Sequence, residues 1–165
     1  MQLRDLFDYK NQLMQDILTN ENLVKMIDRT VPFEQSEKLA YKNVFPYEYI
    51  PDTANHGVTY VCFDVDVLDV VSKTFLNPTI YVWIFTHRTN MRLPEGGLLI
   101  DEFCAELCET INGSRFYGMG ELNLVSVRRF APMTDFQGKV LAFRATEVNR
   151  YHLPQKPIPS NRKLG

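Results

Sequence analysis

The chain has 165 residues, of which 45% are hydrophobic and 23% are charged, and its formal net charge is −2. These values are typical of a globular domain with a substantial core, and they exclude a chain whose overall charge attracts it to nucleic acid or to anionic membranes. No apolar run approaches the roughly 20 residues of a membrane-spanning helix, and the amino terminus lacks the apolar segment of a signal peptide. We therefore expect synthesis in the cytoplasm and no membrane partner.

The amino-terminal part combines two predicted helices with a less regular stretch. Apolar residues recur at helical spacing over residues 3–18, and a shorter helix is predicted over residues 23–28. Thr19–Asn22 should interrupt the two helices, with an asparagine in the left-handed conformation at the helix end. Residues 33–49 are mixed. The run Phe45–Pro51 contains two prolines that cannot donate to a sheet ladder, so it predicts an edge strand or an extended arm.

Two alternating stretches follow and predict an antiparallel pair of strands. The first is Val58–Asp69 and the second is Thr79–His87, joined by the connector Ser72–Pro78 in a hairpin. In the first strand, one face should carry Val61, Phe63, Val65 and Val67, and the other should carry Cys62, Asp64 and Asp66.

A third helix is predicted after a polar loop over Arg88–Gly97. Leu98–Ile111 carries one apolar stripe at a spacing of four residues, and Asn112–Gly113 should end the helix. The members of the stripe are Leu99, Phe103, Leu107 and Ile111. A helix of this kind packs its stripe on a neighbouring layer, here the predicted sheet.

A second pair of strands completes the predicted domain. Leu122–Phe130 and Lys139–Val148 have strand character, and a turn is expected at Asp135–Gly138 within a longer loop over 130–138. The predicted class is α+β: a mainly antiparallel sheet packed against a helix, with an N-terminal helical segment. We expect one domain over residues 1–150.

The carboxyl terminus differs in composition and predicts an extended C-terminal arm over residues 151–165. The tail Leu153–Gly165 holds three prolines, three basic residues and few apolar ones, so it cannot pack a core of its own. Its basic residues are Lys156, Arg162 and Lys163.

The three cysteines do not have the spacing of a zinc ribbon. Cys104 and Cys108 lie one helical turn apart and, with His87, could supply three metal ligands. Apolar neighbours favour the alternative, in which these residues and Cys62 are reduced, buried thiols. The sequence therefore predicts no metal and no cofactor.

Asp64 and Asp66 are the sharpest candidates for chemistry. Two carboxylates on one strand face could hold Mg²⁺ for a nuclease or phosphatase reaction. However, the strand continues past them, and no lysine or histidine lies at the spacing of a base, which favours a solvated or subunit-facing acidic face. Glu95-Gly96-Gly97 lacks the lysine of a phosphate-binding loop, and no Ser-His-Asp arrangement is supported. The sequence predicts a protein that is not an enzyme.

Arginines near loops and strand ends are candidates for contacts with partners. If they gather on one rim, they could meet phosphate or acidic groups of a neighbouring chain, whereas scattered solvation is the alternative. Arg128 and Arg129 point to opposite faces of one strand, so at most one of them can join such a patch. The predicted subunit or partner contacts are Arg88, Arg92, Glu95, Arg115, Arg128, Lys156, Arg162 and Lys163.

Three segments, together with the order of helices and strand pairs, carry a resemblance to a known family. They are LMQDILTNENLVKMID at 13–28, MRLPEGGLLIDEFCAEL at 91–107 and NGSRFYGMGELNL at 112–124. In these features residues 1–150 resemble the tail-terminator and tail-to-head joining proteins, which are neck proteins of long-tailed bacteriophages. The resemblance includes no catalytic signature.

The resemblance implies an α+β subunit that assembles into a hexameric ring. Such a ring stacks on the last ring of the tail tube and joins the tail to the head connector, and DNA passes through its lumen. The implied partners are further copies of the chain, the tail-tube protein and head-connector proteins, and the implied location is the virion neck after synthesis in the host cytoplasm. The arm and Phe45–Pro51 depart from the simplest family plan, which leaves head completion or a connector role open. The alternatives outside the family are a metal-dependent nuclease or phosphatase and a small adaptor that contacts no nucleic acid.

Overall fold

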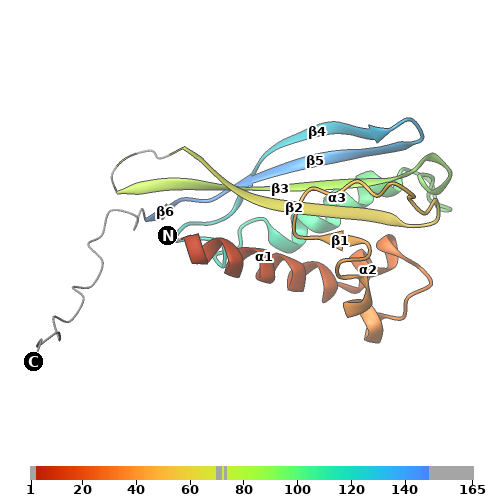
Figure 1. Cartoon of the computed structure of the whole chain (residues 1–165), viewed down its shortest axis with the longest axis horizontal. Coiled ribbons are helices and arrows are strands. Elements are labelled where there is room, and N and C mark those ends of the chain that lie inside the picture. The colour runs from red at the N-terminus through yellow and green to blue at the C-terminus, as the bar shows by residue number, and fades with distance from the viewer. Residues whose placement is uncertain (1–2, 70–71, 73, 149–165) are drawn as a thin grey trace, which may run out of the picture.

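In the computed structural model, which describes residues 3–69, 72 and 74–148, three α-helices pack on one face of a six-stranded sheet (Figure 1). The helices are α1 (Leu3–Leu18), α2 (Glu21–Ile27) and α3 (Leu99–Ile111), and short 3-10 turns occur at Phe33–Leu39 and Arg88–Asn90. The strands are β1 (Val44–Phe45), β2 (Thr59–Asp69), β3 (Phe75–His87), β4 (Asn123–Met133), β5 (Phe136–Arg144) and β6 (Glu147–Val148). The predicted α+β class, with its N-terminal helix and mainly antiparallel sheet, is confirmed.

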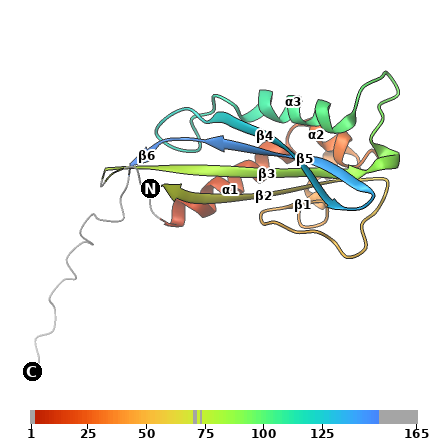
Figure 2. The same ribbon diagram turned by 90° about the horizontal axis from the view of Figure 1, so that it is seen from above.

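The strand order differs from the order along the chain. The strands lie in the order β1-β2-β3-β5-β4, and β6 pairs with the beginning of β3. Every pairing is antiparallel except that of β1 with β2, which is parallel. After α3 the chain therefore forms the outer strand β4 first and then returns between β4 and β3 as β5 (Figure 2).

The main core lies between the helices and one face of the sheet. Leu13 and Ile17 of α1 and the predicted stripe of α3 are almost fully buried there, because apolar residues at helical spacing form a single face. They meet Phe63 of β2 and Phe143 of β5, which are completely buried. The predicted helix over 3–18 is confirmed, and α3 begins one residue later than predicted.

The junction between α1 and α2 corrects one detail of the prediction. The Asn20 backbone is extended, with φ −93°, rather than left-handed, and its side-chain oxygen accepts the Leu23 N–H at 3.1 Å. Asn20 is thus the N-cap of α2, so this helix begins at Glu21 rather than Leu23. The Asn20 amide also donates to Glu106 and Thr110 of α3, at 2.7 and 2.9 Å. One side chain therefore caps α2 and joins it to α3.

The chain after Ala40 forms a short edge strand and then an irregular segment that contains the two prolines. Val44 and Phe45 make the short outer strand β1, and the chain from Pro46 to Pro51 forms no strand. A proline lacks the N–H that a sheet ladder requires, so the strand ends where the first proline occurs.

The predicted connector Ser72–Pro78 is too long, because β3 begins at Phe75. Pro78 lies within the strand, opposite Val67, and the register of β2 shifts between Val67 and Asp69. The missing N–H of Pro78 is thus placed where the ladder is already irregular, while its carbonyl accepts the Ala145 N–H at 3.1 Å. Tertiary pairing therefore extends the strand through a proline that the sequence suggested was a connector.

The predicted turn at Asp135–Gly138 is also wrong. Thr134 and Asp135 form a two-residue turn, and Gly138 lies inside β5 between Phe85 of β3 and Phe130 of β4. There is accordingly no long loop over 130–138; this stretch is the tip of a tight hairpin. The predicted end of α3 is confirmed, because Gly113 adopts φ 79°, which suits glycine.

The predicted arm over 151–165, with Lys156, Arg162 and Lys163, lies outside the described residues. Within the described part of the chain, no helix combines the length and the apolarity needed to cross a bilayer.

Candidate functional site on the open face of the sheet

Among the described residues, one segment covers an end of the sheet face opposite the helices. There the chain between β1 and β2 folds over a small second core of six buried residues, Phe45, Val58, Tyr60, Cys62, Phe85 and Phe136. Two hydrogen bonds hold this cover: the Cys62 thiol donates to the Tyr49 carbonyl at 3.1 Å, and the Tyr60 hydroxyl accepts the Asn55 N–H at 2.8 Å. No other described helix, strand or loop lies over this face (Figure 2), which we call the open face.

The open part of the face forms a hollow of about 510 Å³ across β3, β5 and β4. It is lined by Thr79, Tyr81, Trp83, Val125, Ser126, Arg128, Val140, Ala142 and Arg144. Tyr81 and Trp83 point to the same side because they are two residues apart on one strand, and their rings stack with centroids 5.9 Å apart. The floor of the hollow is therefore aromatic.

Hydrogen-bond donors surround this aromatic floor. The guanidinium groups of Arg128 and Arg144 are exposed, and neither forms an ion pair with any described residue. The Thr79 hydroxyl is buried and has no hydrogen-bond partner in the described part of the chain. Buried polar groups are nearly always hydrogen-bonded, so this hydroxyl is an exception, but its oxygen is shielded and presents no surface to the hollow.

The acidic pair lies beside this hollow on β2. Asp64 forms an ion pair with Lys10 of α1 at 2.6 Å, while Asp66 is exposed and lies opposite Thr79 in the sheet register. The described residues contain no group of three or more histidine, cysteine, aspartate or glutamate side chains placed to hold a metal ion. Within the described part of the chain, Asp64 therefore has Lys10 as its partner, and Asp66 lies at the border of the hollow.

The cysteines and His87 do not meet. Cys104 and Cys108 are half-buried on α3, against the helix-covered face, whereas His87 ends β3 beside the second core. All three cysteines are free, and burial raises the pKa of Cys62 and that of Cys104 to about 11. The expectation of buried thiols is confirmed for Cys62, whereas Cys104 and Cys108 are only partly buried. The raised pKa values disfavour the thiolate forms of Cys62 and Cys104 at neutral pH.

The predicted contact residues do not gather on one rim. Arg88 lies at the His87 end of β3 and pairs with Asp135 at 3.1 Å, whereas Arg115 follows α3 at the opposite end and pairs with Glu121 at 2.9 Å. Arg92 is exposed in the loop before α3. Of the five predicted contacts within the described residues, Arg128 lines the hollow and Glu95 lines a second, smaller groove.

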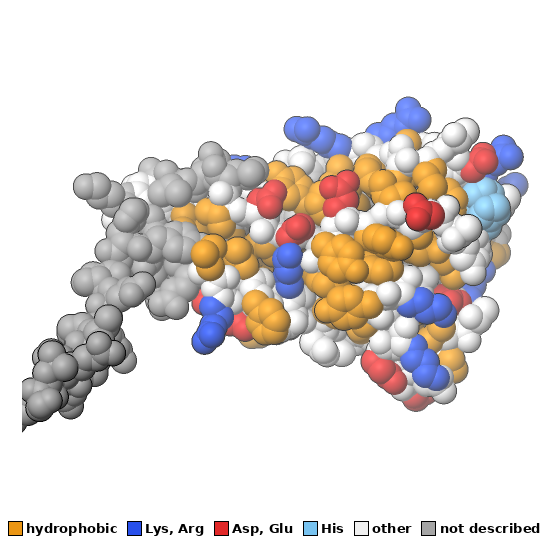
Figure 3. All heavy atoms as spheres, in the orientation of Figure 1, with side chains coloured by type: hydrophobic (Ala, Val, Ile, Leu, Met, Phe, Trp, Pro, Cys, Tyr) orange, Lys and Arg blue, Asp and Glu red, His pale blue; other side chains and the backbone are white. Residues whose placement is uncertain are grey.

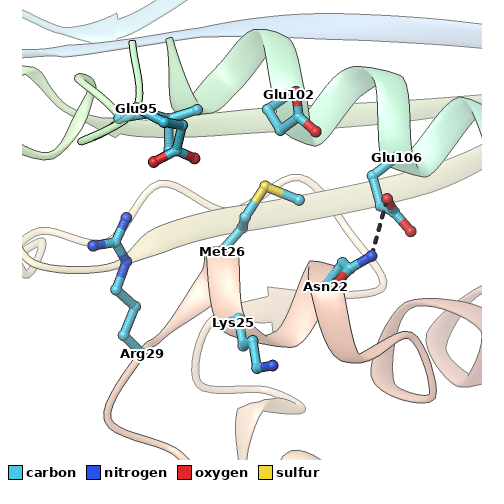
Figure 4. A pocket seen from close by; sticks show the side chains of 8 residues that line it. Asn22, Lys25, Met26, Arg29, Glu95, Glu102 and Glu106 are labelled. Atoms are coloured by element: carbon cyan, nitrogen blue, oxygen red, sulfur yellow. Dashed lines mark hydrogen bonds between the residues drawn. The ribbon is translucent and has the colours of Figure 1, made fainter. Parts of the chain in front are cut away.

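That second groove lies between α2 and α3 and has a volume of about 290 Å³ (Figure 4). It is lined by Asn22, Lys25, Met26, Arg29, Leu93, Glu95, Glu102 and Glu106. Lys25 points away from the carboxylates of this groove and pairs with Glu21. The Arg29 guanidinium points towards Glu95, and the Asn22 amide of α2 donates to Glu106 of α3 at 3.3 Å (Figure 4). Together with the bonds of Asn20, this places the groove at the junction that fixes α2 against α3.

Sequence reasoning missed most of the hollow. The alternation of Thr79–His87 was enough to place Thr79, Tyr81 and Trp83 on one face, and the same period places Val140, Ala142 and Arg144 together. The sequence contains no sign that β5 rather than β4 lies next to β3, so Arg128 and Arg144 could not be placed beside the two aromatic rings.

Two stacked histidines lie beside the second core, and they predict that the stability of the fold depends on pH. The rings of His56 and His87 lie 3.8 Å apart and nearly parallel, and His87 Nδ1 accepts the Thr89 N–H at 3.3 Å. Burial is the main cause that lowers the pKa of His87 below 6.5; the charges of His56 and Arg88 lower it further, and that of Asp135 opposes them.

Because the fold favours neutral His87, protonation favours the unfolded chain, so stability should fall as the pH decreases below 6.5. We expect an NMR pH titration of the ring signals to place the His87 pKa below that of a free histidine, and His56→Gln to raise it. A His87 pKa above 6.5 in the unaltered chain would contradict this arrangement.

Comparison with known proteins identifies the family of this chain. No curated protein matches the chain. The model of the YomW family matches residues 6–145, which run from α1 to the residue after β5 and include every residue that lines the hollow. The name of this family indicates a phage-related protein. Since the match spans most of the sequence, the chain belongs to the YomW family.

Proposed function

We propose that the chain is a structural protein of a bacteriophage neck, and specifically a tail terminator. Copies of the chain form a ring that caps the tail tube and joins it to the head connector, and DNA passes through the lumen. The phage-related family and the resemblance of residues 1–150 to neck proteins support this proposal. The ring acts by position and shape, without catalysis.

The observation that carries the proposal is that the subunit has a different apolar surface at each edge of its sheet. At one edge, no described strand pairs with the outer side of β4, and Val125 and Val127 are 49% and 46% exposed. A long, unpaired and partly apolar edge strand is a site for pairing with another chain.

The opposite edge carries β1, β2 and the segment after β1. Hydrophobic side chains gather on this side of the molecule (Figure 3), and the exposed ones include Tyr47, Tyr49 and Ile50. Rings form when one surface of a subunit binds a different surface of the next, so two unlike apolar surfaces at opposite edges suit a ring rather than a two-fold dimer.

Light scattering coupled to size separation tests the proposal. We expect a species near six times the 19.2 kDa mass of one chain, and electron microscopy should show a ring with a central hole. Val127→Asp should disrupt the ring, because a buried, unpaired charge at a contact is unfavourable. The subunit itself should unfold at an unchanged denaturant concentration, since Val127 is exposed.

Ala105→Asp is the matched control, because Ala105 is exposed on α3 rather than at either sheet edge. Equal loss of assembly in both variants would indicate a general effect of added charge. Mg²⁺-stimulated hydrolysis of nucleic acid or of a phosphate ester that disappears in Asp64→Asn would replace the structural function by an enzymatic one.

A further inference from the structure

The hollow on the open face has the chemistry of a site for a proline-rich peptide. Such peptides bind along aromatic side chains, because proline rings pack well on flat apolar surfaces. Tyr81 and Trp83 provide this surface, and no hydrogen bond within the described residues uses the Tyr81 hydroxyl or the Trp83 indole N–H. Together with the guanidinium groups of Arg128 and Arg144, these groups make the hollow rich in hydrogen-bond donors.

The chain itself contains a segment that matches these donors. Residues 149–165 include Pro154, Pro157 and Pro159 and no acidic residue. Prolines have a carbonyl acceptor and no N–H, so a proline-rich segment presents a surplus of acceptors. In the extended polyproline conformation, residues 154–159 would span about 16 Å, which exceeds the roughly 13 Å of strand from Thr79 to Trp83. The segment is therefore long enough to cross the aromatic floor.

A single ion pair at the border of the hollow provides a second match. Asp66 is exposed on β2 opposite Thr79, at the border of the hollow, and forms no ion pair with any described residue. Lys156 lies between Pro154 and Pro157, so a segment whose prolines lie on Tyr81 and Trp83 can bring this lysine to Asp66. The acidic pair identified in the sequence then has a binding role.

The direction of the chain at β6 indicates which copy supplies the segment. Glu147 pairs with Leu76 and Val148 with Phe75, so the chain moves away from Thr79, Tyr81 and Trp83 as it leaves the described fold. At its last described residue the chain therefore points away from its own hollow, which favours the hollow of a neighbouring copy as the binding site.

We propose that the hollow formed by Tyr81, Trp83, Arg128 and Arg144 receives the C-terminal segment, residues 149–165, of a neighbouring copy of this chain. Pro154–Pro159 lie on the two aromatic rings, and Lys156 pairs with Asp66. The inference rests on the proposed ring, because the ring brings the neighbour into place, and it assigns a molecular basis to the contact between successive subunits.

Trp83 allows a direct measurement, since it is the only tryptophan in the chain. The acceptor is the full chain with Pro154→Ala, Pro157→Ala and Pro159→Ala, which leaves the hollow intact. A synthetic peptide of residues 149–165 contains no tryptophan and should change the Trp83 emission in a saturable way.

Two changes should each weaken this binding at least tenfold. The first replaces the three prolines of the peptide, and the second adds Asp66→Asn to the acceptor. Glu102→Gln, in the groove between α2 and α3, is the control that should leave binding unchanged.

A mixing experiment tests whether the contact is between copies. Arg144→Glu disables the hollow and leaves the segment intact, whereas the triple proline variant disables the segment and leaves the hollow intact. Each variant alone should lose the assembled species, and their mixture should form a complex of two chains, because one functional segment meets one functional hollow.

The outcomes separate this inference from the proposed ring. If both variants still assemble like the unaltered chain and the peptide leaves Trp83 emission unchanged, the inference is wrong while the ring stands. If the unaltered chain is a monomer and the peptide still binds at Trp83, the ring is wrong, and the hollow is a receptor for its own segment. If only the mixture of the two variants forms a two-chain complex, the inference is supported, and a ring-sized species of the unaltered chain supports the ring.

Discussion

Replacing Gly138 with alanine is expected to destabilise the fold by about 4 kcal/mol or more, the largest effect we predict for a single substitution. Gly138 lies in β5, between Phe85 of β3 and Phe130 of β4. A Cβ atom at this position would lie 1.8 Å from the Ile84 carbonyl oxygen and 2.7 Å from the Phe85 Cα. Both are backbone atoms, so no change of rotamer can relieve the overlap.

The overlap at Gly138 would also displace the whole strand β5. β5 is hydrogen-bonded to β3 on one side and to β4 on the other, so moving it disturbs both ladders and the hollow that spans them. The rings of Phe85 and Phe130, 5.8 Å apart, belong to the two residues that pair with Gly138 on either side, and they would lose their packing as well.

Urea denaturation measures this effect, with Gly120→Ala as the control. At Gly120 the nearest heavy atom would lie 3.9 Å from an added Cβ, which is an ordinary contact, so the free energy of unfolding should stay within about 0.5 kcal/mol. A Gly138→Ala chain as stable as the Gly120→Ala chain would show that the strands approach less closely than the structure indicates.

Phe103→Ala is expected to cost about 3–5 kcal/mol of folding free energy. Phe103 is fully buried in the middle of the α3 stripe and packs in the main core beneath the sheet. Truncating it removes apolar contacts on several sides and leaves a cavity between α3 and the strands, which the rigid sheet cannot fill.

The same denaturation experiment detects this loss, and Glu109→Ala provides the control on the exposed side of the same helix. Alanine is at least as good a helix former as glutamate, so the control should be nearly neutral. If Phe103→Ala were also nearly neutral, α3 would not be held on the sheet through this residue.

The helices could be predicted from the sequence because their signals are local. The stripe of α3 and the apolar spacing over residues 3–18 depend only on residues three or four positions apart, and both helices were found almost to the residue. The beginning of α2 was missed because Asn20 acts through its side chain, as an N-cap that is also bound to α3, and not through a left-handed backbone.

The strands were found, but their ends and neighbours were not. Pro78 and Gly138 are residues that usually mark connectors and turns, yet each lies within a strand for a reason supplied by its neighbours: a register shift in β2 at Pro78, and close packing against Ile84 at Gly138. The order β3-β5-β4 is a property of the folded sheet, so the sequence could not bring Tyr81, Arg128 and Arg144 together as one site.

The fold brings together residues for which the sequence predicted separate roles. Arg128 was predicted as a contact residue and Asp66 as half of a possible metal site, while Tyr81 and Trp83 were seen only as strand residues. In the fold they line or border one open surface with aromatic, cationic and acidic groups side by side. Such a surface suits the binding of another polypeptide, as the proposed ring would require.

The mass of the assembled protein in solution tests the central proposal most directly. Light scattering on the full chain at high concentration should give a ring-sized species near six times the mass of one chain, and this species should disappear in Val127→Asp but persist in Ala105→Asp. A strictly monomeric chain under the same conditions would contradict the proposal that this member of the YomW family is a ring-forming neck protein. An assembly whose mass is unchanged by Val127→Asp would contradict it as well.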